Sequence, residues 1–292
     1  MIDMALYRTG HEEAAMIGII DVGGGLRGIY GAGVLDYCMD NGISFDYCAG
    51  VSAGAANLCS YLAGQRGRNY HFYTEYAFRK EYMSLKSFLK SGSYINLEYV
   101  YGTLSNRDGE NPLDYEAMKN CGKIFKIVAT NARTGRPKYF NLKDLKQDDY
   151  GPVKASSCVP IVNRPYVIGG VPYFDGGLTD PIPVRKALKD GCEKVVVVLT
   201  RPVDFYRNPK KDVRMARLLL KSYPNSARAL ARRSAYYNRS LELCKEYQRD
   251  GKVLIVAPAD IGGMSTLTRN QEAIEMMYRE GLKDARAIES FL

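Results

Sequence analysis

Two short glycine-rich stretches hold the residues of this sequence that are best suited to chemistry. Residues 50–54 read Gly-Val-Ser-Ala-Gly, and residues 21–28 read Asp-Val-Gly-Gly-Gly-Leu-Arg-Gly. In the first stretch, Gly50 and Gly54 allow a tight strand-to-helix turn that would hold the hydroxyl of Ser52 out at the top of a sheet. In the second, glycine N–H groups without neighbouring side chains can hold an oxyanion or a phosphate. Together the stretches predict a serine hydrolase with Ser52 as the nucleophile.

A nucleophilic serine needs a base, and the sequence contains only 2 histidines. His11 precedes the first predicted strand, and His71 lies beyond a helix whose far end would be about 18 Å from Ser52 at 1.5 Å per residue. We therefore do not expect a Ser-His-Asp triad. Asp175 is the other candidate, since it follows a short predicted strand and a buried carboxylate can accept the serine proton directly. Asp-Gly is also a common turn dipeptide, so this position alone fits a turn residue as well.

The glycine loop has a competing interpretation. The glycines within residues 23–28 also fit the fingerprint of a dinucleotide-binding loop. That fold requires an acid at the end of the second strand, whereas Asp46 lies at the beginning of the second predicted strand. The pattern therefore favours an oxyanion loop formed by Gly23, Gly24 and Gly25.

Short apolar strands alternate with helices around these stretches, which favours a parallel sheet with crossover helices. Residues 68–104, rich in Tyr and Phe, indicate helices and loops over the sheet, either an ordinary layer or a cap. A hairpin over residues 166–177 would carry Asp175 to its loop. The other predicted strands cover residues 16–22, 45–50, 123–131, 136–142, 195–199 and 252–257, and the other predicted helices cover residues 29–41, 52–64, 150–158, 183–190 and 267–292.

The bulk composition fits one large α/β domain over residues 1–292. Of the 292 residues, 46% are hydrophobic, which is enough for a substantial core. The 7 cysteines contain no CxxC pair and favour reduced thiols in the cytoplasm. The N-terminus lacks the pattern of a signal peptide, and no apolar run approaches the roughly 20 residues that span a bilayer. We expect a cytoplasmic protein, at most peripheral at the inner membrane surface.

The net charge of +9 is concentrated in one window, residues 205–239. A helical, basic C-terminal extension is predicted from about residue 205 to 292. The window is either a solvated helical face or a contact for an anionic membrane surface. We expect no nucleic-acid partner, because no zinc-finger, helix-turn-helix or RNA-recognition signature accompanies the charge. Against the single acid Asp212, the window contains the cations Arg207, Lys210, Lys211, Arg214, Arg217, Lys221, Arg228, Arg232, Arg233 and Arg239.

The glycine loop, the Gly-Val-Ser-Ala-Gly stretch and Asp-Gly-Gly at residues 175–177 resemble, in order and spacing, the motifs of the patatin-like phospholipase family. Residues 155–160 also resemble a segment of that family. Similar segments at residues 31–36, 61–68 and 237–256 point to a bacterial branch of it and extend the resemblance over nearly the whole chain. Two departures are Val51, where the family often has a smaller residue, and Asp-Gly-Gly, where many members have Asp-Gly-Ala. Neither departure removes a reacting group.

The resemblance implies a three-layer α/β/α sandwich with a mostly parallel central sheet. It also implies an acyl hydrolase that cleaves fatty acyl esters of lipids with a Ser–Asp dyad. Ser52 would be the nucleophile, Asp175 the base and Gly23–Gly25 the oxyanion loop, with Arg27 beside it to steady the loop or bind substrate. No metal or other cofactor is implied. The alternative is a catalytically silent protein that keeps the fold and binds membranes or acts as a scaffold. These patterns specify neither the lipid headgroup nor the oligomeric state.

Overall fold

The computed structural model describes residues 15–84 and 92–292, and its centre is an eight-stranded mixed sheet. Seven strands follow the order β5-β6-β3-β2-β1-β7-β8, and the eighth, β4, pairs with β3 outside this order. Strands β2, β1, β7 and β8 are parallel to their neighbours, as is β3 to β2, whereas β4 and β6 run antiparallel to β3, and β5 to β6. The mostly parallel α/β architecture is confirmed. The strands are β1 (Ile17–Asp21), β2 (Tyr47–Val51), β3 (Ile124–Asn131), β4 (Arg136–Asn141), β5 (Tyr166–Ile168), β6 (Val171–Asp175), β7 (Lys194–Val198) and β8 (Val253–Val256).

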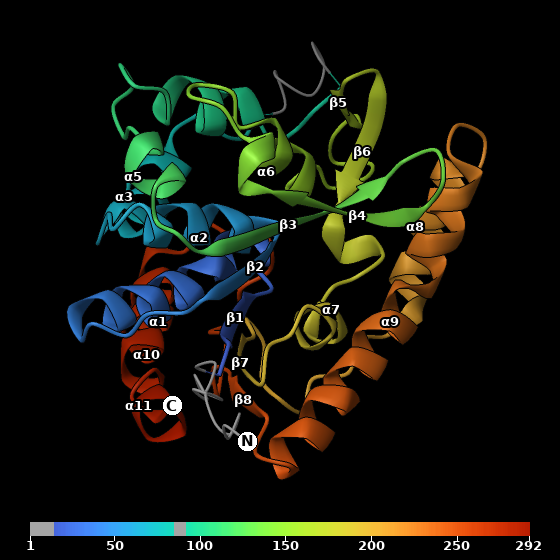
Figure 1. The fold of residues 1–292 in the computed structure, drawn as a ribbon. Helices are drawn as coiled ribbons and strands as arrows, with labels where there is room; N and C mark the ends of the chain where they lie inside the picture. Colours follow the sequence, from blue (N-terminus) through green and yellow to red (C-terminus); the bar gives the residue numbers. More distant parts are fainter. Residues whose placement is uncertain (1–14, 85–91) are drawn as a thin grey trace, which may run out of the picture.

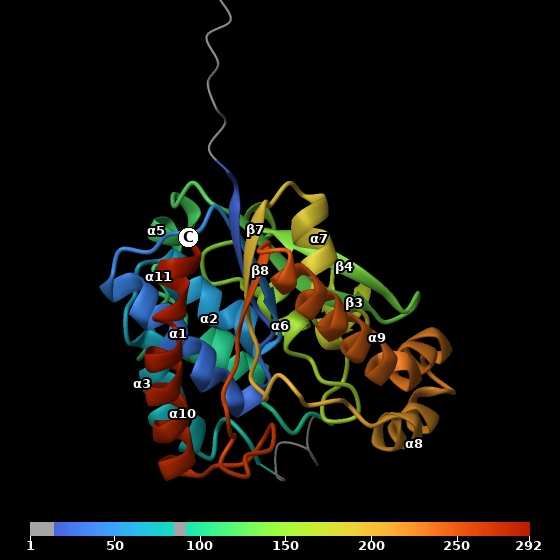
Figure 2. The same ribbon diagram turned by 90° about the horizontal axis from the view of Figure 1, so that it is seen from below.

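Helices cover both faces of the sheet, and alternate residues of each central strand point to opposite layers (Figures 1 and 2). In β1, Ile19 packs with the larger core cluster and Ile20 with the smaller one, and both are fully buried. One layer contains α1 (Ile29–Asp40), α2 (Ala53–Leu62), α3 (Arg68–Thr74), α6 (Gly151–Ser156) and α10 (Gln271–Asp284), and the other contains α7 (Val184–Lys189) and α9 (Pro224–Arg249).

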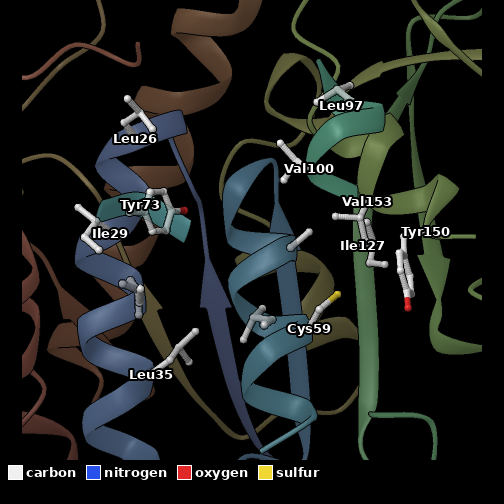
Figure 3. Close-up of a cluster of buried hydrophobic side chains, with 14 of the residues drawn as sticks. Leu26, Ile29, Leu35, Cys59, Tyr73, Leu97, Val100, Ile127, Tyr150 and Val153 are labelled. Atoms are coloured by element: carbon white, nitrogen blue, oxygen red, sulfur yellow. The ribbon is translucent and has the colours of Figure 1, made fainter. Parts of the chain in front are cut away.

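Figure 3 shows how the larger core cluster joins α1, α2 and the neighbouring segments. Ile29 and Leu35 of α1, Cys59 of α2 and Ile127 of β3 are all buried in it. The remaining short elements are η1 (Gly25–Gly28), η2 (Tyr76–Phe78), η3 (Tyr99–Leu104), α5 (Tyr115–Lys119), η4 (Leu142–Asp144), η5 (Gly176–Leu178), α8 (Pro209–Leu219) and α11 (Ala287–Phe291).

The C-terminal region packs against the N-terminal half of the chain. Strand β8 extends the sheet beside β7, and α10 lies against α1 (Figure 2). Two glycines bring these helices close together, because a Cβ on Gly33 would lie 2.3 Å from the carbonyl oxygen of Tyr278, and a Cβ on Gly281 would lie 2.2 Å from that of Tyr30. Any larger side chain at either position would force the helices apart.

The helix expected over residues 267–292 is shorter and broken. Helix α10 begins at Gln271 because the side chain of Asn270 accepts the N–H of Ala273 at 3.2 Å, which is an N-cap interaction. The helix ends at Asp284, and α11 follows as a separate short turn. Part of the predicted cap, residues 85–91, lies outside the described residues. In the described part of the chain, no helix combines the length and the apolar character needed to cross a membrane.

Candidate active site

The chemistry-bearing segments meet at one edge of the sheet, beyond the carboxyl ends of β1, β2 and β7, where open α/β sheets bind ligands. Asp21, at the end of β1, lies opposite both Gly50 of β2 and Val198 of β7. Strand β6 arrives antiparallel to β3, with Asp175 opposite Ala129. The register therefore carries the end of β6 to the same edge as the turn after β2.

Ser52 occupies the strained turn that the sequence predicts between a strand and a helix. Its backbone has φ 57° and ψ −129°, a conformation that non-glycine residues rarely adopt and that recurs at functional sites. Gly50 and Gly54 permit the turn because a Cβ on either would lie within 2.3 Å of the backbone of Ala55 or Asp21. Strand β2 and helix α2 therefore approach each other closely enough to hold the serine at the sheet edge.

Ser156, at the end of α6, fixes the turn against β3. Its Oγ accepts the N–H of Ser52 at 2.8 Å and donates to the carbonyl oxygen of Val128 at 2.6 Å. Ser156 is fully buried, and its hydrogen bond to Val128 is shielded from water, whereas the one from Ser52 is partly buried. The sequence around Ser156 did not reveal this role, since its two hydrogen-bond partners, Ser52 and Val128, are distant in the chain.

Asp175 is 4% exposed and lines the same cavity as Ser52. Its Oδ1 accepts the N–H of Gly177 at 2.7 Å. Burial raises the pKa of the Asp175 carboxyl above its ordinary value of 3.8, while the charge of Arg233, the neighbouring Ser52 hydroxyl and the hydrogen bond from Gly177 act in the opposite direction. A carboxylate with a raised pKa is a better base for a serine hydroxyl than an exposed one.

The glycine loop lines the cavity that also contains Ser52 and Asp175, and its backbone adopts a conformation that favours glycine. Gly23, Gly24 and Gly25 have φ values of 63°, 126° and 62°. The N–H of Gly23 donates to Asp21 Oδ1 at 2.8 Å, whereas the N–H groups of Gly24 and Gly25 have no hydrogen-bond partner among the described residues. The backbone donors open to a ligand are therefore those of Gly24 and Gly25, and Gly23 instead anchors the loop.

A buried polar network holds the loop in place. Asp21 is fully buried, and its Oδ2 accepts from Asn57 Nδ2 at 2.9 Å. The same amide group donates to the carbonyl oxygen of Gly28 at 2.8 Å, and Tyr73 donates to Asn57 Oδ1 at 3.1 Å. Burial raises the pKa of Asp21 to about 6, against the hydrogen bonds from Asn57 and Gly23 that lower it. The side chains of Asp21, Asn57 and Tyr73 hold the glycine loop in position and do not themselves line the cavity.

Arg27 is 6% exposed, so it is not a surface charge. Its Nε donates to the carbonyl oxygen of Thr200 at 3.2 Å, and Nη1 donates to Thr266 Oγ1 at 3.3 Å. Burial, together with the nearby charge of Arg201, lowers the pKa of Arg27 to about 9. The side chain thereby ties the glycine loop to the segments after β7 and before α10.

A cavity of about 150 Å³ brings the sequence-predicted residues together. Gly23, Gly24, Gly25, Arg27, Ser52 and Asp175 all line it. Further lining residues that the sequence did not single out for this site are Thr200, Arg201, Phe205, Arg207, Arg233, Tyr237 and Thr266. Arg207 and Arg233 belong to the basic window, so part of that positive charge faces the site. A run of cations in a sequence does not reveal which of its members turn inward.

A second cavity of about 450 Å³ adjoins the first and shares Val159, Arg201, Phe205, Arg207, Arg233 and Thr266 with it. Ile95, Val162, Met215 and Leu267 give this second cavity an apolar lining. The two cavities therefore place a polar, cationic compartment next to the serine and, beside it, a larger one that combines the shared arginines with apolar side chains.

No histidine among the described residues lines this site. His71 lies on α3, is exposed and does not line the cavity, and His11 lies outside the described residues. Within residues 15–84 and 92–292, no group of three or more His, Cys, Asp or Glu side chains is arranged to hold a metal ion.

Comparison with known proteins gives two family matches. The model of the patatin-like phospholipase family matches residues 22–188, which include the glycine loop, Ser52 and Asp175. A second model, a domain of unknown function (DUF6363), matches residues 223–290.

Individual relatives match about two thirds of the chain or more. "Uncharacterized protein YjjU" of Escherichia coli is 33% identical over 71% of this chain and 58% of its own length. "Lysophospholipase NTE1" of Candida albicans is 25% identical over 69% of this chain and 14% of its own length. The chain thus spans little more than half of the first relative and a small part of the second. Among solved structures, VipD from Legionella pneumophila aligns with a TM-score of 0.49 and 14% identity, over 94% of this chain and 66% of VipD.

Proposed function

Because the chain belongs to the patatin-like phospholipase family, we propose that it is a serine acyl hydrolase that cleaves fatty acyl esters of lipids. Ser52 is the nucleophile and Asp175 the base. The observation that carries this proposal is that Ser52, on its strained turn, and the buried Asp175 line one cavity together with the glycine loop.

The first half of the reaction forms an acyl-enzyme. Asp175 takes the proton from Ser52 as Oγ attacks the ester carbonyl carbon, and the carbonyl electrons move onto oxygen. The N–H groups of Gly24 and Gly25 bind this oxyanion, and loss of one such donor typically costs about 3 kcal/mol. When the tetrahedral intermediate collapses, the C–O bond to the alcohol or lysolipid breaks. Asp175 returns the proton to that leaving oxygen.

The second half releases the fatty acid. A water molecule gives a proton to Asp175 and attacks the acyl carbon on Ser52. Collapse of the second oxyanion breaks the bond to Ser52 Oγ, which takes back the proton. The second cavity, with Val162, Met215 and Leu267 in its lining, is the natural place for the acyl chain.

We also propose that the outward part of the basic window contacts anionic membrane lipid. Arg214, Arg217 and Lys221 are exposed on or directly after α8, beside the exposed side chains of Leu218 and Leu220. Cations flanking exposed apolar side chains fit a helix that rests at a lipid surface. Residues of α8 also line the second cavity, so this contact would bring the cavity close to its substrate.

Hydrolysis of short-chain acyl esters and of phospholipids by the purified chain tests the enzymatic proposal. Replacing the nucleophile in Ser52→Ala, or the base in Asp175→Asn, should lower kcat/KM at least about a thousandfold. Ser290→Ala, which changes an exposed serine of α11, is the matched control and should retain full activity. Circular dichroism should show that all three variants remain folded.

Two results would contradict the proposal. One is activity of Ser52→Ala within tenfold of the parent. The other is a folded parent protein that hydrolyses none of these esters, which would favour the catalytically silent membrane-binding or scaffold alternative.

A further inference from the structure

Four arginine side chains from four separate segments line the cavity that contains Ser52. Arg27 belongs to the glycine loop, Arg201 follows β7, Arg207 precedes α8 and Arg233 lies on α9. Figure 1 shows that α9 begins beside α8 and then runs along one side of the sheet, so that the first turns of α9 and α8 lie at the same end of the molecule.

Little negative charge balances these arginines. Asp212 holds Arg207 through two hydrogen bonds of 2.6 and 2.7 Å. Arg27, Arg201 and Arg233 form no ion pair with any acid in the described part of the chain. Among the described residues, Asp175 is the one acid that lines the cavity, and its carboxylate already accepts the N–H of Gly177. The cavity therefore carries a net positive charge.

Most N–H donors of these four guanidinium groups have no hydrogen-bond partner among the described residues. A guanidinium has five N–H donors. Arg233 uses its Nε for the carbonyl oxygen of Gly177 at 2.9 Å. Arg201 lies over the ring of Phe205, 4.2 Å from its centroid, and makes no hydrogen bond within the described residues. This contact restrains the Arg201 side chain, and its N–H donors have no partner within the described residues, so they are available to a ligand.

The arginines also oppose one another electrostatically. Burial lowers the pKa of Arg27, Arg201 and Arg233, and the charge of Arg207 lowers each of them further. An anion bound among these groups would relieve the repulsion and replace part of the lost hydration.

We propose that Arg201, Arg207 and Arg233 form a subsite for a phosphate group, so that the protein favours acyl esters with a phosphate monoester near the ester bond over neutral acyl esters. This inference rests on the proposed acyl hydrolase activity. Arginine forks bind phosphate oxygens in a bidentate manner, which suits a dianionic tetrahedral group. The first cavity, of about 150 Å³, suits a compact headgroup, and the second, of about 450 Å³, leaves separate room for the chain.

A matched pair of soluble substrates tests the subsite. Hexanoylglycerol phosphate and monohexanoylglycerol carry the same ester, and short chains keep both monomeric, so no membrane surface contributes. The parent protein should show kcat/KM at least about tenfold higher for the phosphate ester, which corresponds to about 1.4 kcal/mol. Arg201→Gln should reduce that preference about tenfold, and Arg201→Lys should restore part of it. Arg228→Gln removes an exposed cation of α9 and should leave both rates unchanged.

Inorganic phosphate provides a second measurement that does not depend on a folded variant. It should inhibit hydrolysis of monohexanoylglycerol by the parent protein, whereas chloride at equal ionic strength should not. Phosphate that inhibits while the two esters react equally well would indicate a site for free phosphate and overturn the substrate subsite.

Failure of this inference is distinct from failure of the proposed function. If both esters are hydrolysed at equal rates, or if Arg201→Gln keeps the full preference, the subsite is wrong and the hydrolase stands. If neither ester is hydrolysed, the hydrolase is wrong, and calorimetric titration with inorganic phosphate then decides the subsite. Heat of binding that is lost in Arg201→Gln supports a phosphate site, and its absence from the parent overturns it.

Discussion

Ser52 and Asp175 lie far apart in the chain, and the strand register brings their side chains to one sheet edge. At the scale of single residues, the proposed chemistry depends on two local departures from ordinary structure. One is the positive φ of Ser52, which the flanking glycines permit. The other is the burial of Asp175, which raises its pKa and makes the carboxylate a stronger base.

Arg233 provides a pH test of the base. Asp175 must be deprotonated to act, so activity should fall as the pH falls through its pKa. Because the charge of Arg233 lowers that pKa, Arg233→Gln should move the acidic limb of the kcat/KM profile to higher pH. Arg233→Lys keeps the charge and should restore the position of the limb. A neutral ester should be the substrate, so that phosphate binding does not contribute.

Arg228→Gln is the matched control for this pH profile, since Arg228 is exposed on the same helix. Its acidic limb should coincide with that of the parent. An unchanged limb in Arg233→Gln would mean that another group serves as the base.

The parts of the site that depend on residues adjacent in the chain could be predicted from the sequence. The turn at Ser52 and the loop at Gly23–Gly25 are encoded by small residues placed directly around them, so both could be recognised without a structure. Ser156 acts through Ser52 and Val128, which are remote in the chain, and Arg201 reaches the cavity only through the fold, so no local pattern reveals either role. Arg233 looks like any other cation of the basic window until the fold turns it toward the cavity.

At the scale of elements, the close crossing of α1 and α10 ties the C-terminal region to the first βα unit. Gly33 and Gly281 let the two backbones meet. Hydrophobic periodicity predicted a helix near the C-terminus, but it set the start four residues early, because the cap at Asn270 outweighs the apolar pattern. Strands were easier to place, since β1, β2 and β7 are short buried runs whose apolar character fits a central parallel sheet.

Substitution at Gly281 tests this crossing. Gly281→Ala places a methyl group 2.2 Å from the carbonyl oxygen of Tyr30, so α10 must shift, and the free energy of unfolding should fall by about 2 kcal/mol. Gly151→Ala is the control, because its added Cβ would have no neighbour closer than 3.4 Å. Urea denaturation followed by circular dichroism measures both.

We propose that residues 1–292 act as one domain, and the same denaturation experiment addresses this. If the C-terminal region belongs to the same cooperative unit, Gly281→Ala should lower the midpoint of a single transition seen by circular dichroism and by loss of activity alike. A separate early transition, with activity retained, would indicate an independent C-terminal unit.

At the scale of the whole molecule, the positive charge has two roles in this account. Arg207 and Arg233 face the cavity, whereas Arg214, Arg217 and Lys221 face outward on or beside α8. Composition predicted a basic region without separating these roles, because only the packing of α8 on α9 decides which side chains turn inward.

Charge reversal on α8 tests the outward role. Arg214→Glu/Arg217→Glu should weaken binding to vesicles of phosphatidylglycerol and phosphatidylcholine about thirtyfold or more, since each cation near such a surface contributes about 1 kcal/mol. Hydrolysis of soluble short-chain esters should not change, because neither residue lines a cavity. Lys143→Glu/Lys146→Glu reverses two exposed charges away from α8 and should bind as the parent does. Equal binding by all three proteins in a sedimentation assay would remove the membrane role.

The identity of the nucleophile is the central claim, and covalent labelling tests it most directly. A fluorophosphonate reacts with an activated serine hydroxyl, and mass spectrometry of the digested protein locates the adduct. We predict one adduct, on Ser52, with labelling slowed at least about a hundredfold in Asp175→Asn because the hydroxyl loses its base. An adduct on any other serine, or labelling of Asp175→Asn at the parent rate, would contradict the account.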